Sequence, residues 1–167
     1  MLEEWVSIEG FPGYIVSNYG GVAKEGTTYL LKTNQVTGGA VRVSLLKGQK
    51  QHQKSVKVLV AEAFVPGKTQ IFDTPVLLDG YPQNLEATNI VWRPRWFAWQ
   101  YTRQLRLRSP HHNKGPVYDR TSGEVYSTIF EAAKVNGILV ADIWRSIQTG
   151  KGTFPTNQKF RFDDRPL

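Results

Sequence analysis

The chain has 167 residues, of which 40% are hydrophobic and 21% charged, a composition typical of a globular protein that excludes intrinsic disorder. It has no Cys, which excludes disulfides, thiolate zinc sites and Cys nucleophiles, and its three His residues offer little for a metal site. The formal net charge of +7 makes a polyanion the first partner to test. No segment resembles a signal peptide or a membrane span, so we expect a cytoplasmic protein.

Residues 1–92 mix short β-type runs with turn residues. Residues 14–17 predict a strand, and so does the run 40–45, in which apolar and polar side chains alternate. Residues 55–64 carry apolar side chains at helical spacing and predict a helix that ends before Pro66. This stretch therefore predicts a small domain of strands and at least one helix.

Residues 93–114 form a basic and aromatic stretch, since no acidic residue occurs between Glu86 and Asp119. Unbalanced positive charge mixed with aromatic rings favours contact with a nucleic-acid backbone over an ordinary solvated face. Residues 96–107 predict a helix that Ser109-Pro110 ends. The basic residues of this stretch are Arg93, Arg95, Arg103, Arg106, Arg108 and Lys114.

Residues 115–167 predict a third compact unit that opens with a β-hairpin over residues 117–126. Thr128 and Glu131 have the spacing of a capping box and open a helix that an Asn-Gly pair ends. A second helix follows and ends at Gly150. Two short helices joined by a Gly-containing turn predict a helix-turn-helix, a motif that in many proteins binds DNA.

Four motifs, in this order along the chain, resemble phage and intron HNH homing endonucleases. Residues 4–20, with Glu-Trp, Gly-Phe-Pro-Gly-Tyr and Val-Ser-Asn-Tyr-Gly, are similar to the N-terminal module of that family. Residues 56–66 resemble the helix before the family's catalytic motif, and residues 79–92 resemble the motif itself. Residues 117–162 look like the helix-turn-helix module that ends many of these proteins. The resemblance covers most of the chain.

The resemblance implies an α+β protein built of small modules in series. Residues 1–92 would hold the N-terminal module and a degenerate ββα-metal (HNH-like) domain. Residues 93–114 would form a basic linker helix. Residues 115–167 would form a β-hairpin plus helix-turn-helix that binds DNA.

The family's chemistry needs a His as general base, a metal-binding Asp or Asn just before it, and an Asn that helps to bind the same ion. Here Leu77 occupies the position of the base and Val76 that of the ligand, whereas Asn89 keeps the family's spacing, twelve residues after Leu77. Leu cannot accept a proton, and Val has no oxygen for a hard cation. We therefore expect a degenerate motif with no metal, no cofactor and no enzyme activity.

The resemblance then implies a sequence-specific protein that binds double-stranded DNA in the host cell. A protein with nuclease contacts but no cleavage stays on its site, so we expect a transcriptional repressor of phage or mobile-element genes. One alternative is an active HNH nicking endonuclease with a displaced catalytic set that uses Asp73, Asp79 or His52. Another is a structural or protein-binding role for a basic module. A monomer and a homodimer are both open.

Family positions give the expected DNA contacts of the first two stretches. Arg42 would face a groove, and Lys54 and Lys57 would lie near phosphates. The linker would follow the backbone and the minor groove with the basic residues given above.

The second helix of the helix-turn-helix would enter the major groove. Arg145 suits guanine and Gln148 suits adenine. Asp142 would accept from cytosine or orient Arg145, and Lys151 would meet phosphate. For Trp144, a base contact and core packing are equal alternatives.

Overall fold

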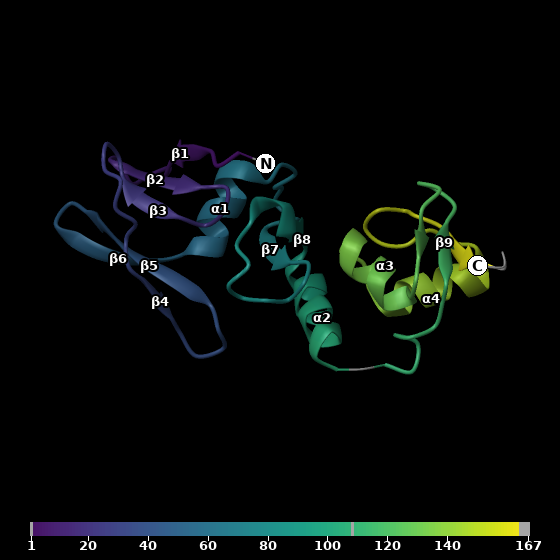
Figure 1. Cartoon of the computed structure of the whole chain (residues 1–167). Coiled ribbons are helices and arrows are strands. Elements are labelled where there is room, and N and C mark those ends of the chain that lie inside the picture. Colours follow the sequence, from purple (N-terminus) through teal and green to yellow (C-terminus); the bar gives the residue numbers. More distant parts are fainter. Residues whose placement is uncertain (1, 108, 164–167) are drawn as a thin grey trace. The chain divides into compact units, whose positions relative to one another are not determined.

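The structure, a computed structural model, describes residues 2–107 and 109–163 (Figure 1). The chain divides into two compact units, Met1–Arg95 and Trp96–Leu167. The described residues form four α-helices, one short 3₁₀ helix and several small antiparallel sheets, so the α+β class is confirmed. No helix in these ranges is long and apolar enough to cross a bilayer.

The expected division into residues 1–92, 93–114 and 115–167 stays a proposal about functional modules. By packing, the linker helix from Trp96 onward belongs to the second unit.

The first unit begins with two three-stranded antiparallel sheets, in which each strand pairs with its neighbour in the sequence. The central strand β5 has the two-residue period of a half-buried strand, because Val43 and Leu45 are fully buried while Arg42 is exposed. The strands are β1 (Trp5–Ser7), β2 (Tyr14–Ser17) and β3 (Val22–Lys24) in one sheet, and β4 (Thr33–Gln35), β5 (Val41–Lys47) and β6 (Lys50–Ser55) in the other.

Helix α1 (Val56–Phe64) follows β6 directly and buries one side. It ends at Val65, which has extended dihedral angles, because the ring of Pro66 disfavours the helical conformation in the residue before it. The strands β7 (Thr74–Leu77) and β8 (Ile90–Arg93) form a two-stranded antiparallel sheet, and η1 (Ala87–Asn89) immediately precedes β8.

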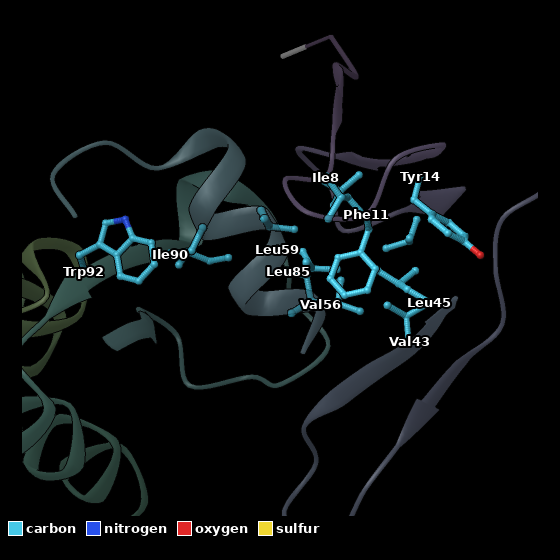
Figure 2. Close-up of a cluster of buried hydrophobic side chains, with 14 residues drawn as sticks. Ile8, Phe11, Tyr14, Val43, Leu45, Val56, Leu59, Leu85, Ile90 and Trp92 are labelled. Carbon is cyan, nitrogen blue, oxygen red and sulfur yellow. The ribbon is translucent and has the colours of Figure 1, made fainter. Parts of the chain in front are cut away.

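The core of the first unit draws side chains from both three-stranded sheets, α1 and β8 (Figure 2). Phe11 lies among the labelled side chains of this cluster, between those of α1 and those of β5. The Trp92 indole N–H donates to the carbonyl of Val65 at 2.9 Å, which ties β8 to the end of α1. Strand β8 and the connection before it are therefore held by buried apolar contacts.

The second unit consists of α2 (Arg95–Arg106), a three-stranded antiparallel sheet and two further helices. The first residue of α2, Arg95, is the last residue of the first unit. The sheet order is β10-β9-β11, so the last strand pairs with the first strand of the hairpin. A second buried cluster fills the space around α3 and α4, with Ile129, Ile138 and Ile143 fully buried. The elements are β9 (Val117–Asp119), β10 (Val125–Tyr126), α3 (Ile129–Asn136), α4 (Val140–Thr149) and β11 (Phe160–Phe162).

The start of α3 has a capping-box arrangement at the two predicted residues, except that Glu131 accepts from Ser127, the residue before the cap, in place of Thr128. The Glu131 backbone N–H donates to the Thr128 hydroxyl oxygen at 3.1 Å, and the Glu131 carboxylate accepts from the Ser127 backbone N–H at 2.7 Å. The hydrogen bonds from Ser127 hold the pKa of Glu131 below its usual range. Gly137 ends α3 at φ 61°, a left-handed conformation that favours Gly and turns the chain toward α4.

Most predicted elements are present with small shifts at their ends, and β6 is the main element that the sequence pattern missed. The residues of β6, Lys-Gln-His-Gln-Lys-Ser, show no apolar alternation. They form a strand because a tight turn at Gly48 and Gln49, both at positive φ, returns the chain along β5. All six residues of β6 then pair with β5.

Thr128→Ala tests the capping box. The variant loses the side-chain acceptor for the Glu131 N–H, so we expect a loss of about 1 kcal/mol of unfolding free energy. Denaturant unfolding followed by circular dichroism measures it. Val135→Ala, at an exposed position of the same helix, is the matched control and should lie close to wild type. Equal midpoints for the two variants would contradict the role of the cap.

Candidate nucleic-acid interface

Val76 and Leu77, the residues at the family's catalytic positions, lie in β7 opposite Val91 and Ile90 of β8. Val76 is buried, and Leu77 is half-buried against the core of the first unit. Both side chains therefore serve packing, and neither supplies a proton acceptor or a cation ligand at this position.

Asn89, the third family position, is buried at the end of η1, and its amide holds the connection between β7 and β8. Its side-chain oxygen accepts from the Asp79 backbone N–H at 3.1 Å. Its side-chain nitrogen donates to the Asp79 carboxylate and to the Asn84 carbonyl, each at 2.9 Å. The Asp79 carboxylate also accepts from the Tyr81 N–H at 2.8 Å and from the Asn84 amide at 2.7 Å.

These donors do not fit a divalent metal ion. The oxygens of Asn89 and Asp79 point into hydrogen bonds that hold their own loop. Among residues 2–107 and 109–163, no group of three or more His, Cys, Asp or Glu side chains is placed to hold a metal. The two other substitutes lie elsewhere, since Asp73 is exposed before β7 and His52 sits on β6 with its ring 5.7 Å from that of Phe11.

The sheet β4-β5-β6 carries the predicted contacts Arg42 and Lys54 on opposite faces. Arg42 points away from the core, and the residues opposite it on the neighbouring strands are Asn34 and Ser55. Lys54 pairs with buried Val43, and its ammonium lies 5.0 Å from the Phe11 ring centre. The sequence predicted Arg42 at a groove and Lys54 near phosphate, and the strand pairing places these two side chains on opposite faces of the sheet.

The outer face of this sheet is polar and includes residues that the sequence analysis missed. Gln53 lies opposite Ser44 and donates a hydrogen bond to its hydroxyl. Asn34, Arg42 and Gln53 are exposed, and their side-chain types suit base edges. The alternation of buried and exposed side chains along β5 could have identified this face, if the residues of β4 and β6 that pair with its exposed positions had been known.

Lys57 lies on α1 and is half-buried, and this burial lowers the pKa of its ammonium group. Arg93 is also less accessible than expected. It is 9% exposed at the end of β8, and its guanidinium donates to the Trp92 carbonyl at 2.9 Å. Arg93 is therefore less accessible to a phosphate than the exposed arginines of α2.

Helix α2 presents Arg95, Arg103 and Arg106 to solvent. The Arg103 guanidinium lies 5.3 Å from the centre of the Trp99 ring, a cation–π distance. Arg108 lies outside the described residues. The basic character of this stretch is thus concentrated on the exposed side of one helix.

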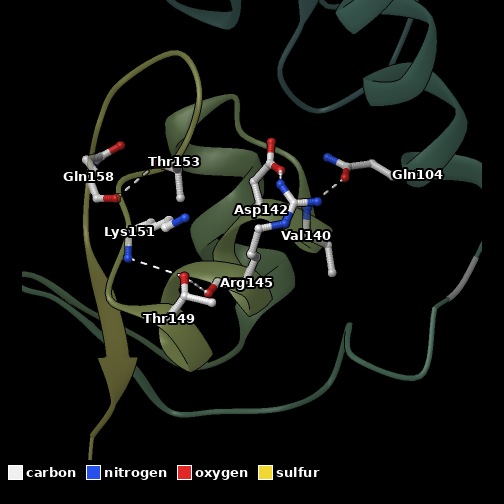
Figure 3. A network of polar contacts seen from close by, with 8 residues as sticks. All are labelled: Gln104, Val140, Asp142, Arg145, Thr149, Lys151, Thr153 and Gln158. Atoms are coloured by element: carbon white, nitrogen blue, oxygen red, sulfur yellow. Dashed lines mark hydrogen bonds and ion pairs between the residues drawn. The ribbon is translucent and has the colours of Figure 1, made fainter.

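Helix α4 carries Asp142 and Arg145, two of the residues predicted to contact DNA, and their side chains lie side by side (Figure 3). The Arg145 guanidinium lies 2.8 Å from the Asp142 carboxylate, and the two side chains are 66% and 15% exposed. Burial raises the pKa of Asp142, and the nearby charge and hydrogen bond of Arg145 oppose that shift. Asp142 thus orients a guanidinium that projects into solvent. Gln148 and Lys151 are exposed further along the same segment.

Trp144 is half-buried against the core of the second unit. Its ring stacks on that of His111 at 4.3 Å, and the Lys114 ammonium lies 4.3 Å from the ring centre. The structure therefore shows the packing alternative for the indole, and a base contact stays a prediction. The exposed ammonium of Lys114 is brought close to α4 by this arrangement.

No protein-family model matches this sequence, and no curated protein matches it. Among solved structures, the chain aligns with the HNH homing endonuclease I-HmuI, which binds and cleaves DNA, at a TM-score of 0.55 and 23% sequence identity. The alignment covers 98% of this chain and 99% of that chain. The fold is that of an HNH homing endonuclease.

This likeness contradicts the expectation that the chain is not an enzyme, because the fold it shares is that of a DNA-cleaving protein. The expectation rested on Val76 and Leu77. Their replacement excludes the family's chemistry at those two positions, but it does not exclude chemistry by other side chains. The similarity to the HNH homing endonuclease fold confirms the resemblance at the level of fold.

Asn89→Ala tests the structural part of this site. The variant removes three hydrogen bonds and leaves partly buried backbone and carboxylate groups without partners, so we expect a loss of about 1–3 kcal/mol in unfolding free energy. Denaturant unfolding measures it. Thr88→Ala, at the adjacent exposed position, is the control. A midpoint for Asn89→Ala equal to that of the control would show that the amide does not hold the loop.

Proposed function

We propose that this protein binds double-stranded DNA and recognises a specific sequence through α4. The observation that carries the proposal is the Asp142–Arg145 pair, which holds an exposed guanidinium on α4, the helix that the sequence predicts to enter the major groove. The shared fold supports it, since I-HmuI binds DNA.

The chemistry of α4 suits the major groove. A guanidinium can donate two hydrogen bonds to guanine O6 and N7, and an amide can pair with adenine N6 and N7. Asp142 restricts the rotamers of Arg145, so less conformational entropy is lost when the guanine contact forms. Gln148, one turn further along the helix, is the candidate for the adenine contact.

Exposed basic side chains elsewhere supply contacts to phosphate without sequence information. On α2 these are Arg95, Arg103 and Arg106, and beside α4 they are Lys114 and Lys151. Arg42, on the outer face of the sheet β4-β5-β6, is a candidate for a groove contact by the first unit. Such contacts set affinity and its salt dependence, whereas α4 sets the sequence preference.

We further propose that the bound site lies at phage or mobile-element genes and that occupancy represses their transcription. A protein that holds promoter DNA excludes polymerase by steric hindrance. The test uses a reporter gene whose promoter contains a DNA site that the protein selects from a random library. The wild-type protein should repress this reporter, and the Arg145→Ala variant should not.

Strand cleavage is the second candidate function, favoured by the shared fold with a DNA-cleaving protein. Its test uses the selected duplex with Mg²⁺, with Mn²⁺ and with EDTA. This candidate predicts nicks at one position with either ion and intact strands with EDTA. A gel shift with both strands intact in all three conditions would contradict cleavage and leave DNA binding in place.

Arg145→Ala and Arg145→Lys test sequence recognition. In a competition assay, we expect the ratio of affinities for a duplex selected from a random library and for random duplex to fall about 10- to 100-fold in both variants. Arg145→Lys keeps the charge but not the two-pronged donor geometry, so it should retain affinity for random duplex. Equal losses of affinity for both duplexes would identify Arg145 as a phosphate contact instead.

A further inference from the structure

One face of α2 carries an exposed indole among cations. Arg95, Trp99, Arg103 and Arg106 follow helical spacing and share this face, while Phe97 and Tyr101 are buried on the other. Trp99 is 63% exposed. We refer to Arg95, Trp99, Arg103 and Arg106 as the Trp99 face.

Trp99 differs from the other exposed indole of α2. Trp96 packs on Phe154 with ring centres 5.4 Å apart and also touches the ring of Phe97 at 5.7 Å. Trp99, within the described part of the chain, has the Arg103 guanidinium as its ring partner. A large apolar side chain left in solvent beside cations is a typical feature of a binding surface.

The second unit fixes the direction in which Trp99 points. The side-chain nitrogen of Gln104 donates to the Ile138 carbonyl at 2.9 Å. Its side-chain oxygen accepts from the Val140 N–H, also at 2.9 Å (Figure 3). The Tyr101 hydroxyl donates to the Lys134 carbonyl at 3.4 Å. These bonds join α2 to the last turn of α3, to the turn that follows it and to the start of α4, so Trp99 and the outer side of α4 keep one geometry.

An open hollow of about 370 Å³ lies between Trp99 and the first turn of α4. Leu139, Val140 and Ala141 line its far side, and Arg103 lines it beside the indole. The indole therefore borders open space, and a ligand can reach the side of the ring that borders the hollow.

The positive charge around Trp99 favours a polyanionic partner. No acidic residue occurs between Glu86 and Asp119, so the Trp99 face complements a polyanion. Proteins that place Arg side chains in the minor groove frequently insert an apolar side chain between base pairs, which unstacks the step and kinks the duplex.

We infer that Trp99 inserts into the base stack from the minor groove and bends the duplex while Arg95, Arg103 and Arg106 hold the flanking phosphates. This inference rests on the proposed function. In this proposal, α2 distorts the DNA locally through Trp99 and also contacts the DNA backbone through its arginines. Sequence preference then includes a step that unstacks easily, such as TA or CA, at a position that α4 does not touch.

The test uses a duplex selected from a random library, labelled at its two ends for energy transfer, with 2-aminopurine placed at successive positions, all in EDTA. Wild-type protein should change the transfer efficiency and raise 2-aminopurine fluorescence at one step. Trp99→Ala should abolish both signals and bind about 5- to 100-fold more weakly. Its salt dependence should match that of wild type, because the phosphate contacts remain.

Three matched variants complete the design. Trp99→Phe keeps a ring and should retain part of both signals. Val135→Ala, at an exposed position of α3 outside the lining of the hollow, should behave as wild type. Arg103→Ala should reduce the salt dependence but leave the 2-aminopurine signal in place. Thermal unfolding of each variant confirms that it folds, and Trp99→Gln replaces Trp99→Ala if the latter does not.

Two negative results are distinguishable. A Trp99→Ala variant that binds and bends the duplex as wild type does would overturn the inference and leave DNA binding intact. A wild-type protein that binds no duplex in the library would overturn the proposed function together with the inference.

Discussion

The two hydrogen bonds made by the side chain of Gln104 set the geometry of the second unit. They join the basic helix α2 to the first turn of α4 through the Ile138 carbonyl and the Val140 N–H. Without them, the start of α4 would lack a side-chain partner, because its cap residue Leu139 offers no acceptor. The same contact thus completes the start of α4 and fixes the position of α2 beside it. The two surfaces that we propose for phosphate and for bases are thereby held in one arrangement.

The first unit has the fold of an HNH homing endonuclease, with apolar side chains at the two positions that the resemblance assigns to the base and the metal ligand. Val76 is buried in β7, Leu77 packs against the core, and the Asn89 amide holds the connection between β7 and β8. The hydrogen bonds between Asp79 and Asn89 give both residues a structural role in this connection. Spacing in the sequence therefore identifies the fold reliably, but it identifies the chemistry only when the side chains are also those of the family.

Local patterns predicted the helices and much of the sheet structure, because capping residues, Pro66 and apolar periodicity act within a few residues. The pairing of β6 with β5 could not be read from its polar sequence, since only the partner strand makes it a strand. The separation of Arg42 and Lys54 onto opposite faces follows from that same pairing. The burial of Arg93 and the stack of Trp144 on His111 depend on contacts between distant residues, which no local pattern encodes. The candidate residues on α4 were predictable because Val140, Ile143 and Ile147 define its inner side.

The central claim is that α4 reads bases in the major groove of double-stranded DNA. Methylation interference on a duplex selected from a random library tests it most directly, because a methyl group on guanine N7 blocks the contact proposed for Arg145. The account predicts that methylation of one or a few guanines within the site abolishes binding, and that methylation elsewhere has no effect. Binding that tolerates N7 methylation at every guanine, yet is lost when phosphates are ethylated, would contradict it.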